Sequence, residues 1–330
     1  MEIENQEHIE SVNPQATAYV KESTDKVIEE LSKVVIGQKH MIELMIAGML
    51  SGGHVLIEGV PGIAKTLIVK LLSRAMDLEF KRIQFTPDLM PADVTGTGVY
   101  NQKSGEFEFH KGPIFANLVL IDEINRAPAK TQAALFEVME ETQITVDGKT
   151  HVLNEPFMVL ATQNPIEQEG TYSLPEAQQD RFLFRIVMEY PSQAEELMIL
   201  ERFESDFDAK IQDTVQVVMK SDVLIKCKNI VESVSIDKTL LEYIASIIHK
   251  TRVTGDLYLG ASPRASLALL KSSKALAAMD GRNYVIPEDI KRALFPVLNH
   301  RVILAPDREM EGVDLNDVLK TIIAEVEIPR

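Results

Sequence analysis

Long apolar runs, paired cysteines and a surplus of basic residues are all missing from this chain. No apolar stretch reaches the ~20 residues that a membrane-spanning helix needs, and the segment from Ile42 to Leu50 is short and carries Glu43. Residues 1–12 are polar and acidic, unlike a signal peptide. The single cysteine, Cys227, cannot form an intrachain disulfide. We therefore expect a cytoplasmic protein without membrane insertion, with Cys227 packed inside a helix.

Acidic residues outnumber basic ones, 50 against 34, which gives a net charge of −16. Affinity for nucleic acid comes largely from a basic face that neutralises phosphates. The charge therefore argues against a nucleic-acid partner and favours a protein or a small molecule. No cysteine pair or histidine cluster has the spacing of zinc ligands. We expect His110, His151 and His300 to be ordinary surface or core residues.

Short apolar segments alternate with helical patterns in the first part of the chain. Strands are predicted at 54–60, 81–85, 117–122, 157–163 and 182–188. Helical periodicity occurs at 15–33, 38–49 and 66–76. Strands that are apolar on both faces and alternate with helices predict a parallel sheet covered by helices on both faces.

Two segments interrupt this alternation and are predicted to be inserted hairpins. One spans 98–110 and turns at Lys103-Ser104-Gly105, and the other spans 143–153 and turns at Asp147-Gly148. After Pro191 the pattern becomes helical, at 193–203, 222–232, 238–251, 262–279, 287–298 and 315–326. We predict a tail over 1–12, an α/β core over 13–190 and a smaller all-helical domain over 191–330.

The segment GVPGIAKT lies between the first predicted strand and its helix, where a phosphate-binding P-loop belongs. Its residues are Gly59, Val60, Pro61, Gly62, Ile63, Ala64, Lys65 and Thr66. Lys65 would reach the phosphates of ATP and the Thr66 hydroxyl would bind Mg²⁺. Ala64 replaces the usual glycine, and we expect an alanine there to keep a negative φ. The alternative is a plain strand–turn–helix corner with a surface lysine.

Two adjacent carboxylates, Asp122 and Glu123, end another buried strand. Burying even one carboxylate is costly, so a solvated strand end explains the pair less well than a metal and an activated water. Asp122 would hold Mg²⁺ through water, and Glu123 would orient or deprotonate the attacking water. Asn164 follows a third strand, at the edge where open parallel sheets bind ligands. By itself, Asn164-Pro165 is also compatible with a simple turn.

These motifs, together with the stretches 174–182 and 260–266, resemble the AAA+ superfamily. The form GxPGxAKT and the segments 121–141 and 161–182 are most similar to its MoxR group. The resemblance runs from about Val35 to the end of the helical domain. It implies an AAA+ P-loop NTPase with a helical lid, and it makes the Ala64 replacement a family feature.

The resemblance also implies roles for further residues. Asn164 matches the first sensor, Arg181 the arginine finger that completes a neighbour's site, and Arg264 the second sensor, which contacts the γ-phosphate. The family's segment that lies near adenine corresponds to Val35, Ile36, Gly37 and Gln38. Arg126 is a second candidate for a contact across subunits. A finger from a neighbour implies a ring, commonly a hexamer. The alternatives are a surface pair of Arg181 with Asp180 and a solvent-exposed helix start at Arg264.

Both predicted hairpins resemble family insertions that face a pore or a client, although plain surface hairpins would show the same pattern. Proteins similar to MoxR are ATPases that assemble or activate other proteins, often with partners that carry von Willebrand factor A domains. The resemblance thus implies ATP, Mg²⁺ and a protein client. Three other functions stay open: a magnesium-chelatase motor subunit, a DNA-dependent motor, which the charge disfavours, and a switch that binds ATP without hydrolysis.

Overall fold

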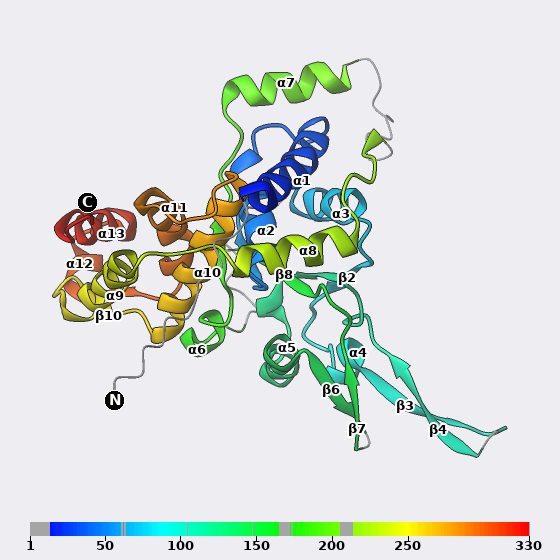
Figure 1. Cartoon of the computed structure of the whole chain (residues 1–330). Coiled ribbons are helices and arrows are strands. Elements are labelled where there is room, and N and C mark those ends of the chain that lie inside the picture. Colours follow the sequence, from blue (N-terminus) through cyan, green and yellow to red (C-terminus); the bar gives the residue numbers. More distant parts are fainter. Residues whose placement is uncertain are drawn as a thin grey trace, which may run out of the picture.

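The first part of the chain folds around a five-stranded parallel sheet (Figure 1). The computed structural model describes residues 14–60, 62, 64–103, 105–146, 148–164, 172, 174–204 and 214–329, so the predicted tail lies outside the described residues. The spatial order is β2-β5-β8-β1-β9. The bounds are β1 Val55–Glu58, β2 Phe80–Gln84, β5 Leu118–Asp122, β8 Met158–Gln163 and β9 Phe184–Val187. All five strands had been predicted, four of them with slightly wider bounds and β2 shifted by one residue.

Successive residues of the strands pack on opposite faces of the sheet, as the pleat requires. Ile57, Leu120 and Leu160 join one apolar cluster, which also contains residues of α1 (Pro14–Ser32), α2 (Lys39–Leu50) and α3 (Lys65–Ala75). Leu56, Val119 and Val159 join a second cluster with residues of α5 (Ala129–Glu141). The predicted parallel sheet with helices on both faces is therefore confirmed.

Two antiparallel hairpins project from the sheet on one side of the molecule (Figure 1). They are β3 (Gly96–Asn101) with β4 (Glu106–Lys111), and β6 (Gln143–Val146) with β7 (Lys149–Val152). A short helix, α4 (Pro91–Thr95), leads into the first hairpin. Gly96 has φ +96°, and a Cβ there would lie 2.3 Å from the His110 carbonyl oxygen, so the hairpin base needs glycine. Both hairpins were predicted, although Ser104 and Asp147 in their turns lie outside the described residues.

The later part of the chain is mainly helical. Its longer helices are α7 (Gln193–Phe203), α8 (Ser221–Glu232), α9 (Lys238–Val253), α10 (Pro263–Met279), α11 (Pro287–Leu298) and α13 (Leu315–Glu325). Cys227 is fully buried in α8, as expected. The structure adds a short helix, α12 (Pro306–Met310), and a small antiparallel pair, β10 (Leu257–Leu259) with β11 (Ile303–Leu304), neither of which was predicted. Among the described helices, none is long and apolar enough to span a bilayer.

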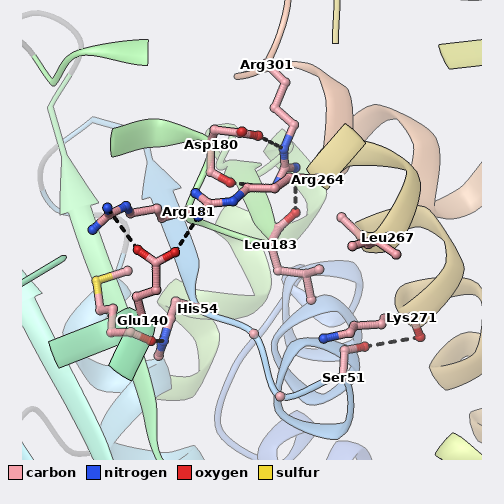
Figure 2. A pocket seen from close by; sticks show the side chains of 14 residues that line it. Ser51, His54, Glu140, Asp180, Arg181, Leu183, Arg264, Leu267, Lys271 and Arg301 are labelled. Atoms are coloured by element: carbon pink, nitrogen blue, oxygen red, sulfur yellow. Dashed lines mark hydrogen bonds and ion pairs between the residues drawn. The ribbon is translucent and has the colours of Figure 1, made fainter. Parts of the chain in front are cut away.

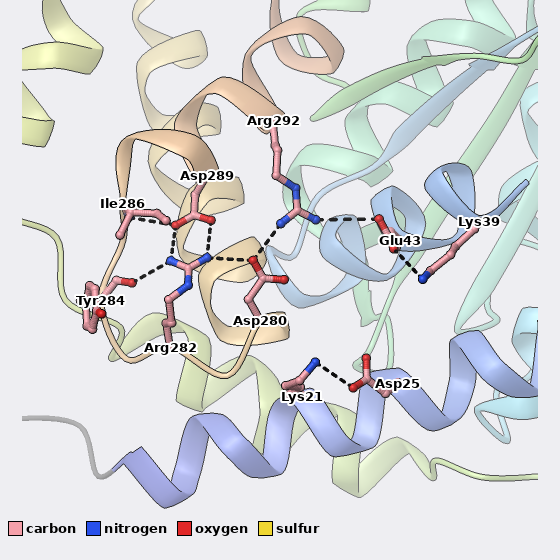
Figure 3. Close-up of polar contacts among 10 residues, drawn as sticks. All are labelled: Lys21, Asp25, Lys39, Glu43, Asp280, Arg282, Tyr284, Ile286, Asp289 and Arg292. Carbon is pink, nitrogen blue, oxygen red and sulfur yellow. Dashed lines mark hydrogen bonds and ion pairs between the residues drawn. The ribbon is translucent and has the colours of Figure 1, made fainter. Parts of the chain in front are cut away.

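The helical part packs closely against the sheet part. One apolar cluster runs from the strands through α1 and α2 into α8 and α10. Polar contacts reinforce this junction: Arg292 on α11 lies 3.8 Å from the Glu43 carboxylate on α2 and 2.9 Å from Asp280 (Figure 3). Because the cluster is continuous, it marks no boundary between two cores, and the predicted boundary near Pro191 stays a prediction.

Candidate active site

The predicted P-loop connects β1 to α3 at the carboxyl edge of the sheet, between Glu58 and Lys65. Gly62 has φ +90° and open space around its Cα. Ala64 has φ +58° and ψ +21°, in the left-handed region. The prediction that Ala64 would keep a negative φ was therefore wrong. This conformation costs an alanine about 1–2 kcal/mol, and the geometry of the loop outweighs that cost. Val60 is half-buried, whereas Pro61 and Ile63 lie outside the described residues.

The start of α3 suits an anion. Ala64 occupies the position before the helix and has no side-chain acceptor to cap the first amides of α3. Lys65, the first helical residue, donates from Nζ to the carbonyl oxygen of Gly59 at 2.5 Å. Burial lowers the pKa of Lys65, although the carboxylates of Asp122, Glu123 and Glu58 oppose this shift. Thr66 follows on the same turn. The loop thus combines the amino end of a helix, which has no side-chain cap from Ala64, with an ammonium group, a favourable setting for phosphate.

Asp122 ends β5 and is only 7% exposed. Its Oδ1 accepts a hydrogen bond from the Thr162 hydroxyl at 3.2 Å, and its Oδ2 accepts one from Arg82 Nε at 2.5 Å. Both partners come from the neighbouring strands β8 and β2, which flank β5 in the sheet. These two partners thus satisfy both oxygens of a buried carboxylate. Asp122 is therefore buried and paired, unlike the solvated strand end considered as the alternative.

Glu123 directly follows β5 and has φ +56°, an unusual conformation for a residue with a Cβ. Its backbone amide donates to Thr162 Oγ1 at 3.0 Å. Its Oε2 accepts a hydrogen bond from Gln84 Nε2 at 2.6 Å and lies 3.0 Å from Arg126 Nε. Arg126, at the end of the short helix η1 (Ile124–Arg126), therefore pairs with a carboxylate of its own chain.

Asn164 follows β8 and is half-buried. Since β8 lies between β5 and β1, Asn164 belongs to the same carboxyl edge as the acidic pair and the P-loop. The segment Val35 to Gln38 connects α1 to α2 and is approached by α7. Arg202 on α7 donates to the Val34 carbonyl oxygen at 2.5 Å. A Cβ on Gly37 would collide with the carboxylate of Glu195, which is also on α7.

The two arginines predicted to contact phosphate lie together in a different place (Figure 2). Arg181 Nη2 lies 2.9 Å from Glu140 Oε2, and Arg264 Nη2 pairs with Oε1 of the same carboxylate. Arg181 thus pairs with Glu140 rather than with Asp180, which was the alternative. Arg264 is near the start of α10, 46% exposed at its side chain, yet held by this ion pair.

This arginine cluster lies at the amino edge of the sheet. It shares its pocket with Ser51 to His54, which precede β1, and with Asp180, which precedes β9. The P-loop follows β1, whose four residues span about 13 Å at 3.3 Å per residue. The predicted catalytic and metal-binding residues of one chain therefore form two groups on opposite edges of one sheet. Lys65, Thr66, Asp122, Glu123 and Asn164 come together, while Arg181 and Arg264 form the second group.

Sequence reasoning missed four residues that contact the predicted site: Arg82, Gln84, Thr162 and Glu140. Arg82 and Gln84 are two residues apart on β2, so they lie on the same face of the strand. The parallel register places Gln84 beside Asp122. A correct sheet order would have identified these two residues. Glu140 contacts Arg264 of the lid, which is 124 residues further along the chain. No local sequence pattern can predict a contact of this separation.

Comparisons with known proteins agree with this geometry. Residues 54–184 match the family model of the ATPase family associated with various cellular activities, and residues 249–322 match an AAA lid domain. The chain is 41% identical to Chaperone MoxR1 of Mycobacterium tuberculosis, over 93% of this chain and 82% of that protein. It is 46% identical to the uncharacterized protein YeaC of Bacillus subtilis, over 92% of this chain and 94% of that one.

A solved structure, that of a candidate ATPase from Cytophaga hutchinsonii, has a TM-score of 0.88 and 44% identity. The match covers 96% of this chain and 98% of that one. The expected resemblance is thereby confirmed across almost the whole chain, including the helical lid. Membership of the AAA+ family implies nucleotide binding. The chain belongs to the MoxR family of AAA+ ATPases.

Proposed function

We propose that this chain hydrolyses Mg·ATP at sites shared between neighbouring subunits of a ring, which we expect to be a hexamer. One observation carries the proposal: the P-loop group and the arginine group lie on opposite edges of the same sheet. In a head-to-tail ring, the carboxyl edge of one subunit can face the amino edge of the next. Each interface would then join Lys65 and Glu123 of one subunit to Arg181 and Arg264 of its neighbour.

The residues present fit a magnesium nucleotide. Mg²⁺ in such sites takes one or two protein ligands and completes its shell with phosphate oxygens and water. Thr66 would be one such ligand and Asp122 would hold the ion through water, and among the described residues no cluster of three His, Cys, Asp or Glu builds a fuller protein cage. When bound, the ion would neutralise charge on the phosphates. The amides that begin α3 and the ammonium of Lys65 would hold those phosphates, and the segment Val35 to Gln38 would lie near adenine.

The carboxylate of Glu123 would orient the attacking water and accept its proton. Asn164 would position the same water or the terminal phosphate from the adjacent strand. The two guanidinium groups of the neighbour would stabilise charge that develops on the transferred phosphoryl. Arg126, which pairs with Glu123 in one chain, is a second candidate for a contact across the interface.

We further propose that hydrolysis drives remodelling, assembly or activation of a protein partner. The support is the relative named Chaperone MoxR1 and the net charge of −16, which disfavours nucleic acid. The β3–β4 hairpin offers a contact surface, because Tyr100 and Phe107 are 53% and 67% exposed and their ring centroids lie 5.3 Å apart. A partner with a von Willebrand factor A domain is the partner that we expect.

Steady-state hydrolysis of Mg·ATP at a series of protein concentrations tests this proposal. Specific activity should rise with concentration as rings form. Glu123→Gln should lower kcat by about 10²-fold, and Arg181→Ala should lower it by about 10³-fold. Activity that is independent of concentration and of Arg181 would contradict the shared site. Tight ATP binding without hydrolysis at any concentration would favour the switch.

A further inference from the structure

Glu140 lies between the two arginines and contacts both of them (Figure 2). Each carboxylate oxygen serves one guanidinium: Oε2 is 2.9 Å from Arg181 Nη2, and Oε1 pairs with Arg264 Nη2. The three groups come from three separate elements. Glu140 is on α5, Arg181 follows α6 (Glu176–Gln179), and Arg264 is on the lid helix α10. Glu140 is thus the one described side chain that bridges the two arginines directly.

The backbones that carry the two arginines are themselves tied together. Asp180 Oδ2 accepts a hydrogen bond at 2.8 Å from the hydroxyl of Ser262, the residue that caps α10. Asp180 Oδ1 accepts another from Arg301 Nε at 2.7 Å, and the Arg301 side chain is only 3% exposed. Arg301 also donates to the carbonyl oxygens of Phe182 and Leu183. The lid and the core are therefore fixed to each other beside Arg181 and Arg264.

Helix α5 holds Arg181 at two points. The guanidinium carbon of Arg181 lies 5.9 Å from the ring centroid of Phe136, within the range of a cation–π contact. Phe136 and Glu140 are four residues apart, so they project from the same face of the helix. Arg181 is held between an aromatic ring and a carboxylate, with its side chain still 30% exposed.

Two guanidinium groups this close repel each other unless an anion lies between them. The contacts with Glu140 use one Nη2 of each arginine. An arginine has five N–H groups, so both retain donors for a further anion. Exposed ion pairs add little to stability, whereas the orientation of catalytic groups strongly affects rates.

We propose that Glu140 is a positioning residue, which holds Arg181 of the core and Arg264 of the lid as one unit for a phosphate bound by the neighbouring subunit. The proposal rests on the proposed function, because it assumes that the arginines serve another subunit's P-loop. Glu140 itself would not contact the nucleotide. Loss of its carboxylate should let the two arginines separate and should lower the activity of the neighbour's site.

Mixed rings test this role and separate it from a merely structural one. Arg181→Ala lacks the arginine but has an intact P-loop, and Glu123→Gln has the reverse, so mixing them should recover activity. Adding Glu140→Ala to the Glu123→Gln subunit should cut the recovered kcat by about tenfold. Adding it to the Arg181→Ala subunit should leave the recovery unchanged, because that subunit contributes only its P-loop. Glu141→Gln, a change at the exposed neighbour on α5, is the matched control and should be silent in both places.

A general loss of folding would reduce recovery from either side, and that symmetric result would overturn the role of Glu140. No loss from either side would overturn it too. Melting temperatures of the variants exclude unfolding, and Glu140→Gln, which keeps one acceptor oxygen, should give an intermediate loss. If the mixture of Arg181→Ala with Glu123→Gln recovers no activity even with Glu140 intact, the shared site itself is contradicted. The inference about Glu140 then falls with it.

Discussion

Gln84 donates a hydrogen bond to Glu123, with 2.6 Å between Nε2 and Oε2, from one parallel strand to the end of the next. This bond and the ion pair with Arg126 fix the carboxylate to which we assign the activation of water. Removing the amide in Gln84→Ala should leave Glu123 less well oriented and lower kcat about five-fold. Nucleotide affinity should change little, because Gln84 does not belong to the phosphate loop.

Single-turnover hydrolysis, together with titration of a fluorescent ATP analogue, measures the two effects separately. Gln102→Ala, in the exposed turn of the β3–β4 hairpin, is the control and should affect neither. An equal loss of affinity and rate in Gln84→Ala would contradict a role that acts through Glu123.

The left-handed backbone of Ala64 predicts an unusual gain from glycine. Relief of the strain outweighs the greater flexibility of glycine in the unfolded chain, so Ala64→Gly should stabilise the nucleotide-free protein by about 0.5–1 kcal/mol. Ala245→Gly, at an exposed position within α9, should destabilise it by about 1 kcal/mol. Urea unfolding of the three proteins gives both values. Destabilisation by Ala64→Gly would show that the loop does not hold a positive φ in solution.

Burial of His54 predicts a loss of stability in mild acid. Its Nε2 lies 2.9 Å from the Met139 carbonyl oxygen, and its Nδ1 accepts from the Val159 amide at 3.0 Å, so the ring fits as the neutral form. Burial lowers the pKa of His54 to about 4, although the hydrogen bond to Met139 opposes the shift. Because the pKa is lowered on folding, neutral His54 contributes fully to the free energy of unfolding above about pH 6.5. This contribution is lost as the pH falls towards 4.

The size of that contribution follows from the shift, about 3 kcal/mol between these pH values. His54→Gln should therefore have a flatter profile of unfolding free energy between pH 6.5 and 4 than the parent protein. His249→Gln, at an exposed position on α9, should keep the parent's profile. Parallel profiles for the parent and His54→Gln would contradict the assignment.

Cys227 should be inert towards thiol reagents in the folded protein. It is 0% exposed within α8, and burial raises its pKa to about 11. Both factors suppress the thiolate that reacts. A disulfide reagent at pH 8 should label less than one tenth of the protein in the time that labels all of it in urea. Rapid labelling without denaturant would show that α8 opens readily.

Much of the sheet and most long helices were predictable because their apolar periodicity is local. The P-loop and the pair Asp122-Glu123 were predictable because each motif follows a strand. The strands β10 and β11 span three residues and two residues, too few to show a period. Ala64 was misjudged because the loop overrides its intrinsic preference. Glu140 was missed because its importance depends on Arg181 and Arg264, which reach it only through the packing of the lid.

The central claim is that each ATP site draws Glu123 from one subunit and Arg181 from the next. The most direct test mixes equal amounts of Glu123→Gln and Arg181→Ala, each nearly inactive alone, and measures hydrolysis of Mg·ATP. If subunits exchange at random, about one interface in four joins two intact halves, so about a quarter of the parent activity should return. A mixture no more active than its separate components, with exchange demonstrated by labelled subunits, would contradict the shared site.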